Sequence, residues 1–308
     1  MLQTGLPELG AHVDDSAGFQ VYNNINEQAS TTEAVKATHN IIAVYDEEPI
    51  GAYYYSTSCG MGSDTGIWHG GSVTPPYLSA REIGVDVVEA LASNSLNATE
   101  LQMKAEQLKD EETFREWIMN VNPSHYESEE GWYRWTYEVE ELDSSHMEEV
   151  LNARYANNPN LILTENDEGE FVSKDIEELG DILDIKITKR IIGGVADELL
   201  IVSENAVIKV LSELNIRYVL SDGVTKVLRQ TQDEVNASAT LPSAFIIIDL
   251  EKEDDNVIGY KITGGGFGHG VGMSQNGAKN MAESGMHCEE IITFYYPGIT
   301  LKTLQFEE

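Results

Sequence analysis

The sequence has few basic side chains, and this shortage excludes two classes of partner. Among 308 residues there are 19 Lys and Arg against 53 Asp and Glu, so the formal net charge is −34. Nucleic-acid binding relies on clustered Lys and Arg that neutralise phosphates, and attraction to anionic membrane surfaces relies on the same side chains. We therefore expect neither partner, whereas the neutral sugar backbone of a glycan is compatible with this charge.

Cysteine and long apolar runs are also scarce. Cys59 and Cys288 are the only cysteines, and neither belongs to a Cys-x-x-Cys or His/Cys cluster, so no zinc site or other cofactor is indicated. The sequence leaves open whether the two form a disulfide. No run approaches the ~20 apolar residues that a transmembrane helix needs, and no signal peptide is present. An apolar fraction of 41% still suffices for a packed core.

Glycine, in contrast, is concentrated in residues 264–275, which we call the glycine loop. Six glycines lie between Gly264 and Gly272, with His269 among them. Neither a dinucleotide-binding Gly-x-Gly-x-x-Gly nor a P-loop fits any register of this run. Ser274 is a candidate N-cap for a helix over 275–283. The residues leave two interpretations open, a tight structural turn and a ligand site on a rigid scaffold.

A second polar segment follows a predicted hairpin of strands over 41–45 and 50–55. We call residues 56–60 the hydroxyl loop; its sequence is Ser56-Thr57-Ser58-Cys59-Gly60. Three hydroxyls and a thiol after a strand indicate either a sugar- or anion-contacting loop or an ordinary polar turn. Cys59 could act as a nucleophile only if its surroundings lowered its pKa. Further along, Trp68 and Tyr77 could stack on a sugar ring or cover an edge of the core.

The remaining patterns predict an α+β fold with a mostly antiparallel sheet core, short helices and an inserted second α+β lobe. The expected divisions are 1–84 for the first part of the core domain, 85–230 for the inserted lobe and 231–308 for the rest of the core. Helices are predicted over 85–94, 101–120, 146–156, 206–214, 275–283 and 288–295, with another starting at a capping box over 30–33. Strands are predicted over 131–139, 182–192, 199–202, 244–249 and 257–262. Acidic runs such as 127–130 and 165–170 are interpreted as solvated loops, and His12, Asp14 and Asp15 are a weak candidate for a metal site.

The glycine loop carries a resemblance to a known family. The run Gly-Phe-Gly-His-Gly-Val-Gly-Met-Ser-Gln-Asn-Gly-Ala at 266–278, followed by Tyr-Tyr-Pro-Gly at 295–298, resembles the C-terminal signature of the stage II sporulation protein D family, which includes amidase enhancers. Earlier segments are similar to further landmarks of that family in its order and spacing: 20–22, 34–35, 49–50, 52–54, the hydroxyl loop and 76–78.

This resemblance implies a role in sporulation and in peptidoglycan remodelling at the cell envelope, outside the cytoplasm. Enzymatic members resemble lytic transglycosylases that cleave the MurNAc-GlcNAc β-1,4 bond of peptide-stripped glycan strands during engulfment. Their catalytic glutamate and membrane anchor lie upstream of the segment matched here. We therefore expect this chain to be N-terminally truncated and inactive as written, with its catalytic residue unknown. The alternative is a non-catalytic, wall-binding amidase enhancer that acts with a cell-wall amidase and other engulfment proteins.

The resemblance also suggests where glycan strands would bind. We expect the hydroxyl loop and residues 269–275 of the glycine loop to meet in space and to orient the glycan through hydrogen bonds. The candidate binding residues are Ser56, Thr57, Ser58, Cys59, Gly60, His269, Gly270, Ser274 and Gln275. Some members carry cysteines near the positions of Val13 and Phe19 that could hold a metal; both are replaced here, so no metal is expected.

Overall fold

The computed structural model describes residues 26–69, 73–236 and 238–305. The predicted metal candidates His12, Asp14 and Asp15, and the landmark at 20–22, lie outside these residues. The chain divides into two compact units, residues 1–43 with 301–308, and residues 44–300. Within the described residues, no helix has the length and apolar character needed to cross a bilayer.

The smaller unit contains one described helix and parts of two strands. These are α1 (Ala29–Ala37), most of β1 (Ile41–Tyr45) and most of β15 (Thr300–Thr303). The helix predicted near residue 30 is confirmed, but its predicted capping box is wrong. The N-cap is Gln28, which makes no side-chain capping bond, and the hydroxyl of Thr32 instead contacts the carboxylate of Glu27.

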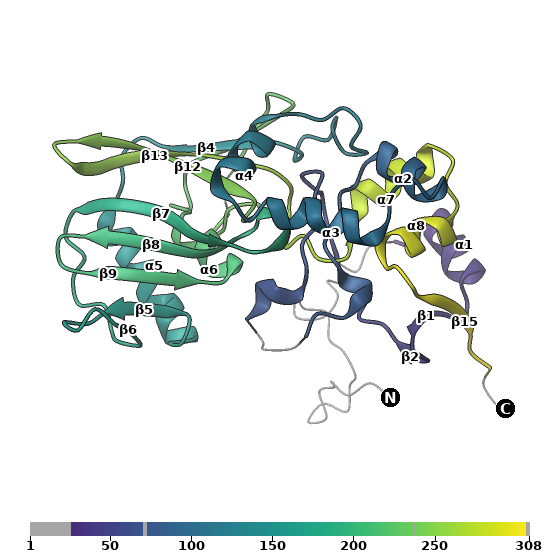
Figure 1. Cartoon of the computed structure of the whole chain (residues 1–308). Coiled ribbons are helices and arrows are strands. Elements are labelled where there is room, and N and C mark those ends of the chain that lie inside the picture. The colour runs from purple at the N-terminus through teal and green to yellow at the C-terminus, as the bar shows by residue number, and fades with distance from the viewer. Residues whose placement is uncertain (1–25, 70–72, 237, 306–308) are drawn as a thin grey trace. The chain divides into compact units, whose positions relative to one another are not determined.

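Two five-stranded antiparallel sheets form the larger unit, and they confirm the predicted α+β class (Figure 1). The first has the order β11-β10-β4-β13-β12 and the second the order β6-β5-β9-β8-β7. The strands of the first sheet are β4 (Trp135–Val139), β10 (Val227–Arg229), β11 (Glu234–Val235), β12 (Ile246–Glu253) and β13 (Asn256–Gly264). The strands of the second are β5 (Ile162–Glu165), β6 (Phe171–Val172), β7 (Ile182–Arg190), β8 (Ala196–Ser203) and β9 (Val207–Leu211).

Seven helices of this unit lie within the described residues. They are α2 (Val85–Ala92), α3 (Ala98–Gln107), α4 (Glu111–Met119), α5 (Ser144–Asn157), α6 (Glu213–Val219), α7 (Gln275–Glu283) and α8 (Cys288–Tyr295). Figure 1 shows α7 and α8 with α2 at the end of the unit opposite to β5 and β6. The helices predicted over 275–283 and 288–295 are confirmed, because capping residues and Pro297 fix their ends locally.

The hairpin of β12 and β13 is the best-predicted part of the sheet core. Its strands pair from Ile246 with Gly264 to Glu253 with Asn256, and the register shifts once, between Glu251 and Lys252. The two turn residues, Asp254 and Asp255, both have positive φ, as the common two-residue hairpin turn requires. Strand β4 pairs with β13 on the other side, so the first sheet joins residues from the predicted insertion and from the C-terminal segment. The three predicted domain divisions stay a prediction.

Several predicted elements are wrong, because a helix cap or the pairing of strands determines the structure there and the local sequence pattern does not. The helix predicted over 101–120 is two helices, since the Asp110 side chain accepts the backbone N–H of Thr113 and starts α4 anew. The helix predicted over 206–214 is strand β9 over most of its length, because its Val and Ile residues favour a strand and it pairs with β5 on one side and β8 on the other. Residues 50–55 do not return beside β1. Only β2 (Glu48–Pro49) does, and β3 (Tyr54–Tyr55) pairs elsewhere.

We predict that Gly264→Ala destabilises the larger unit. A Cβ on Gly264 would lie 2.4–2.7 Å from the buried indole ring of Trp135. The ring would have to leave its packed position, and such overpacking costs about 1–3 kcal/mol. Urea unfolding followed by circular dichroism measures the change. The matched control is Lys261→Ala on the same strand, whose exposed side chain pairs with exposed Glu138. The control should change the free energy of unfolding by less than about 0.5 kcal/mol. Equal stability of the two variants would contradict the packing argument.

Candidate functional site

The hydroxyl loop and the glycine loop lie side by side, joined by backbone hydrogen bonds. The carbonyl of Phe267 accepts the N–H groups of Ser56 and Thr57 at 3.1 Å each, and the N–H of Phe267 donates to the carbonyl of Thr57 at 2.8 Å. Next to them, β3 pairs in parallel with β14 (Met273–Ser274). Two segments more than 200 residues apart therefore form one continuous backbone layer, as the sequence suggested.

The glycines permit this close approach. Gly268 and Gly272 have φ values of 113° and 77°, which side chains rarely adopt. A Cβ on Gly268 would lie 2.7 Å from the Cβ of Tyr55, and one on Gly272 would lie 2.0 Å from the carbonyl oxygen of Tyr53. The run is thus a tightly packed turn, and its packing against residues 53–57 places the ring of His269 beside that of Tyr55. The carbonyl of Gly270 accepts the N–H of Ser63, so Gly270 lies beyond the hydroxyl loop.

Ser274 links the glycine loop to α7. Its hydroxyl accepts the N–H of Gly277 at 3.4 Å, which confirms the predicted N-cap. The next side chains differ in exposure, since Gln275 is exposed while the amide of Asn276 donates to the hydroxyl of Thr57 at 2.9 Å. The start of α7 is therefore tied to the hydroxyl loop by side chains as well as by backbone.

A buried carboxyl group, that of Glu127, lies between the two loops. Its Oε1 accepts the N–H of Ser58 at 2.8 Å and the hydroxyl of Ser274 at 2.5 Å. The side chain has no exposed surface, and burial raises the pKa of Glu127 from 4.5 to about 7. The interpretation of residues 127–130 as a solvated loop is wrong at this position. The sequence gives no signal for it, because the partners of Glu127 lie 69 and 147 residues away.

The other oxygen of Glu127 faces a small set of unpaired polar atoms. Within the described chain, Oε2 of Glu127 and the hydroxyls of Tyr55 and Tyr295 are buried without a hydrogen-bond partner. A Cβ on Gly277 would lie 2.2 Å from the hydroxyl of Tyr295 and 2.9 Å from Oε2. Only glycine fits at this position of α7, so the helix can approach the carboxyl group closely.

His269 is held neutral in an aromatic cluster. Its Nδ1 accepts the N–H of Val271 at 3.1 Å, and burial lowers the pKa of His269 to about 4. Its ring centroid lies 5.8 Å from that of Tyr55 and 5.7 Å from that of Trp68, which in turn lies 4.7 Å from Tyr53. Trp68 and Tyr53 are 40% and 46% exposed, so the cluster presents an aromatic surface beside the loops. The sequence also indicated Tyr77 as a residue that could stack on a sugar. Its hydroxyl accepts the N–H of Gly51.

Cys59 is an inert thiol. It is completely buried, its Sγ lies 3.6 Å from the carbonyl oxygen of Met61, and burial raises its pKa to about 12. The condition for a nucleophilic cysteine is therefore not met. Cys288 is exposed, and the two cysteines are unpaired.

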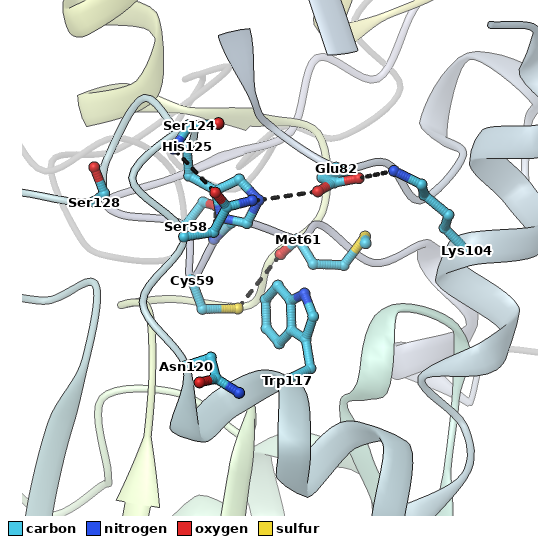
Figure 2. Close-up of polar contacts among 12 residues, drawn as sticks. Ser58, Cys59, Met61, Glu82, Lys104, Trp117, Asn120, Ser124, His125 and Ser128 are labelled. Atoms are coloured by element: carbon cyan, nitrogen blue, oxygen red, sulfur yellow. Dashed lines mark hydrogen bonds and ion pairs between the residues drawn. The ribbon is translucent and has the colours of Figure 1, made fainter. Parts of the chain in front are cut away.

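A cavity of about 420 Å³ lies behind the hydroxyl loop, and no sequence pattern pointed to it. Figure 2 shows the Glu82 carboxylate between His125 and Lys104 on its wall, with Trp117 nearby. Oε1 lies 3.0 Å from Nε2 of His125, and Oε2 accepts from Nζ of Lys104 at 2.9 Å. Burial alone would raise the pKa of Glu82, but these two partners hold it below its usual value. His125 Nδ1 also contacts the hydroxyl of Tyr133 at 2.6 Å.

Arg134 ties this cavity wall to the hydroxyl loop. Its guanidinium is buried and donates to the carbonyl of Cys59 at 2.8 Å. Its other hydrogen bonds go to four further carbonyls, those of Trp117, Ile118, Asn120 and Tyr133. Three of these carbonyls belong to the end of α4, where helical partners are lacking, so one side chain fixes the helix end and the loop together.

Comparisons with known proteins identify the family of the chain and several relatives. The domain has an α+β fold. The chain belongs to a family described as a domain of unknown function (DUF8618), whose family model matches residues 66–272. The chain is 26% identical to the amidase enhancer of Bacillus subtilis (strain 168) over 301 residues, or 96% of this chain and 36% of that protein.

Two shorter matches concern stage II sporulation protein D. The chain is 55% identical to the protein of Bacillus amyloliquefaciens over 40 residues, which are 13% of this chain and 12% of that protein. It is 54% identical to the protein of Bacillus subtilis (strain 168) over 37 residues, 12% of this chain and 11% of that protein. The predicted resemblance to the stage II sporulation protein D family is thereby confirmed. The chain spans about a third of the length of the amidase enhancer.

We predict that Glu127 makes the folded state less stable as the pH rises. Its folded pKa of about 7 lies above the ordinary value of 4.5, so its contribution to stability is complete below pH 4.5 and is lost as the pH rises through 7. At 1.36 kcal/mol per pKa unit the loss is about 3 kcal/mol. Free energies of unfolding in urea, measured from pH 4.5 to 8, give the profile.

Glu127→Gln is the reference variant for this measurement. Its amide oxygen can still accept from Ser58 and Ser274, but the side chain does not titrate. The difference between wild type and variant should shift by about 3 kcal/mol across this range, in favour of the variant at high pH. Parallel pH profiles of the two proteins would show that the carboxyl group is not the titrating group.

Proposed function

We propose that this chain binds peptidoglycan glycan strands through the surface formed by half-buried Ser56 of the hydroxyl loop and the aromatic cluster of Tyr53, Trp68 and His269. The carrying observation is the junction of the two loops, which holds the exposed rings of Tyr53 and Trp68 against His269. Thr57, Ser58, Cys59 and Gly60 of the hydroxyl loop are buried and support this surface from within. Rings that stack on sugar faces, combined with neutral hydrogen-bonding groups, suit the sugar rings of a glycan.

The names of the relatives support a role in the bacterial cell envelope during sporulation. One relative is an amidase enhancer and two are stage II sporulation proteins. On this basis the chain takes part in cell-wall remodelling outside the cytoplasm. A cell-wall amidase and other engulfment proteins are its proposed partners.

If the chain also cleaves the glycan strands that it binds, we propose that it acts as a lytic transglycosylase. It would require a carboxylic acid with a raised pKa that reaches the glycosidic oxygen. Of the two glutamates described at the site, Glu127 has a raised pKa but no exposed surface, and the pKa of Glu82 is lowered. The described site therefore supports binding more directly than cleavage, which favours the amidase-enhancer form of the function.

We predict that His269→Ala weakens glycan binding about tenfold while the protein stays folded. The variant removes a ring that packs against Trp68, and a loss of about 1.4 kcal/mol of binding free energy corresponds to a tenfold weaker affinity. Co-sedimentation with purified peptide-free glycan strands measures binding, and circular dichroism reports folding. Trp68→Ala should show the same loss. The control Met119→Ala, which removes an exposed apolar side chain at the end of α4, should bind as wild type. An unfolded His269→Ala together with a fully binding Trp68→Ala would favour a purely structural role for the glycine loop.

Product analysis separates binding from cleavage. After incubation of this chain with the same strands, mass spectrometry should find intact glycan and no anhydro-muramic ends, because the described site offers no exposed acid with a raised pKa. Anhydro ends would assign the chemistry to a carboxylate within these 308 residues, with Glu127→Gln as the first variant to examine. A purified cell-wall amidase added with the chain tests the enhancer function directly.

A further inference from the structure

Arg81 is a buried cation without an anionic partner. It is 8% exposed, and within the described residues its side chain donates only from Nη1 to the carbonyl of Phe294 and from Nη2 to the hydroxyl of Ser79, the latter at 3.3 Å. Its Nε is buried and has no partner. Burial lowers the pKa of Arg81 to about 10, and no carboxylate of the described chain counteracts this.

The other buried arginines have more hydrogen-bond partners than Arg81. Arg190 donates to the carboxylate of Glu111 and to two backbone carbonyls. Arg134 directs its hydrogen bonds to five carbonyl oxygens. Arg81 alone among these three has a guanidinium nitrogen without any partner, and this Nε adjoins the weakly bonded Nη2. These two nitrogens form the edge of the guanidinium that binds a carboxylate through two parallel hydrogen bonds.

Arg81 also lines a cavity of about 460 Å³. The cavity walls are largely apolar and include Tyr45, Leu91, Leu101 and Phe294, while Gln102 and Thr293 supply polar groups. Among the described residues that line it, Arg81 is the only charged one. A cavity of this size is typical of small-molecule sites, and its charge distribution fits a ligand with one negative group and an apolar body.

We propose that Arg81 and this cavity form a binding site for an organic monocarboxylate. The carboxylate pairs with Nε and Nη2 of Arg81, and the apolar part of the ligand lies against Leu101 and Phe294. A phosphate dianion fits less well, because it would bring a second negative charge to a site with one cation. The site is distinct from the surface proposed to bind glycan strands, and the proposal does not depend on that function.

The test uses 3-phenylpropionate as the probe and its neutral analogue 3-phenylpropanamide as the matched ligand. Isothermal titration calorimetry with the full chain should show binding of the acid and at least about tenfold weaker binding of the amide. Acetate, which lacks the apolar body, and inorganic phosphate should bind more weakly than the acid. The acid should also raise the melting temperature of the wild type as its concentration rises.

Two substitutions at Arg81 complete the test. Arg81→Lys keeps the charge but loses the planar pair of donors, so it should bind the acid at least about tenfold more weakly. Arg81→Met should show no binding and no rise in melting temperature. The control Arg115→Met removes an exposed arginine that pairs with Asp249, and it should bind as wild type.

Three results would overturn the proposal. These are equal affinity for the acid and the amide, undiminished binding by Arg81→Lys, and absence of any binding by the wild type. In each of these cases Arg81 would only link Ser79 to Phe294. If Arg81→Met fails to fold, the comparison of acid with amide and the Arg81→Lys variant still decide the question.

Discussion

The carboxyl group of Glu127 connects three segments that are far apart in the sequence, and the candidate site depends on this connection. One oxygen accepts hydrogen bonds from the hydroxyl loop and from the N-cap of α7. The same group is buried, with no cation paired to it among the described residues. A buried, unpaired carboxylate is costly, which is why the protonated form is favoured and why the geometry of the site is coupled to a proton.

The buried positive charges of Arg134 and Arg190 have more hydrogen-bond partners than the buried carboxyl group of Glu127. The chain has only 19 basic residues, yet Arg81, Arg134 and Arg190 are all largely buried. A guanidinium carries five N–H groups in a fixed plane, so one side chain can satisfy several carbonyls that secondary structure leaves unpaired. Arg134 does this at the end of α4. The net charge of −34 therefore describes the surface and says little about how the core is held together.

Sequence reasoning succeeded where local pattern decides the structure. The N-cap at Ser274, α7 and the hairpin of β12 and β13 depend on residues within a few positions of one another. It failed where the structure depends on contacts between residues that are far apart in the sequence. Residues 206–214 have enough helix-forming character to suggest a helix, but pairing of β9 with β5 and β8 overrides it. Likewise, acidic composition predicts a solvated loop at 127–130, whereas Glu127 is buried by contacts that no local window contains.

The two interpretations of the glycine loop, structural turn and ligand site, describe the same arrangement. The glycines let the backbone of residues 266–274 lie against that of residues 53–57, and this contact carries His269 to the aromatic cluster. Burial there keeps the imidazole neutral at physiological pH. The neutral ring is fixed by two backbone hydrogen bonds, one from the N–H of Val271 to Nδ1 and one with Tyr54. The tight packing that constrains the loop therefore also holds the ring of His269 against Tyr55 and Trp68, and this fixes the aromatic surface proposed to stack on sugar rings.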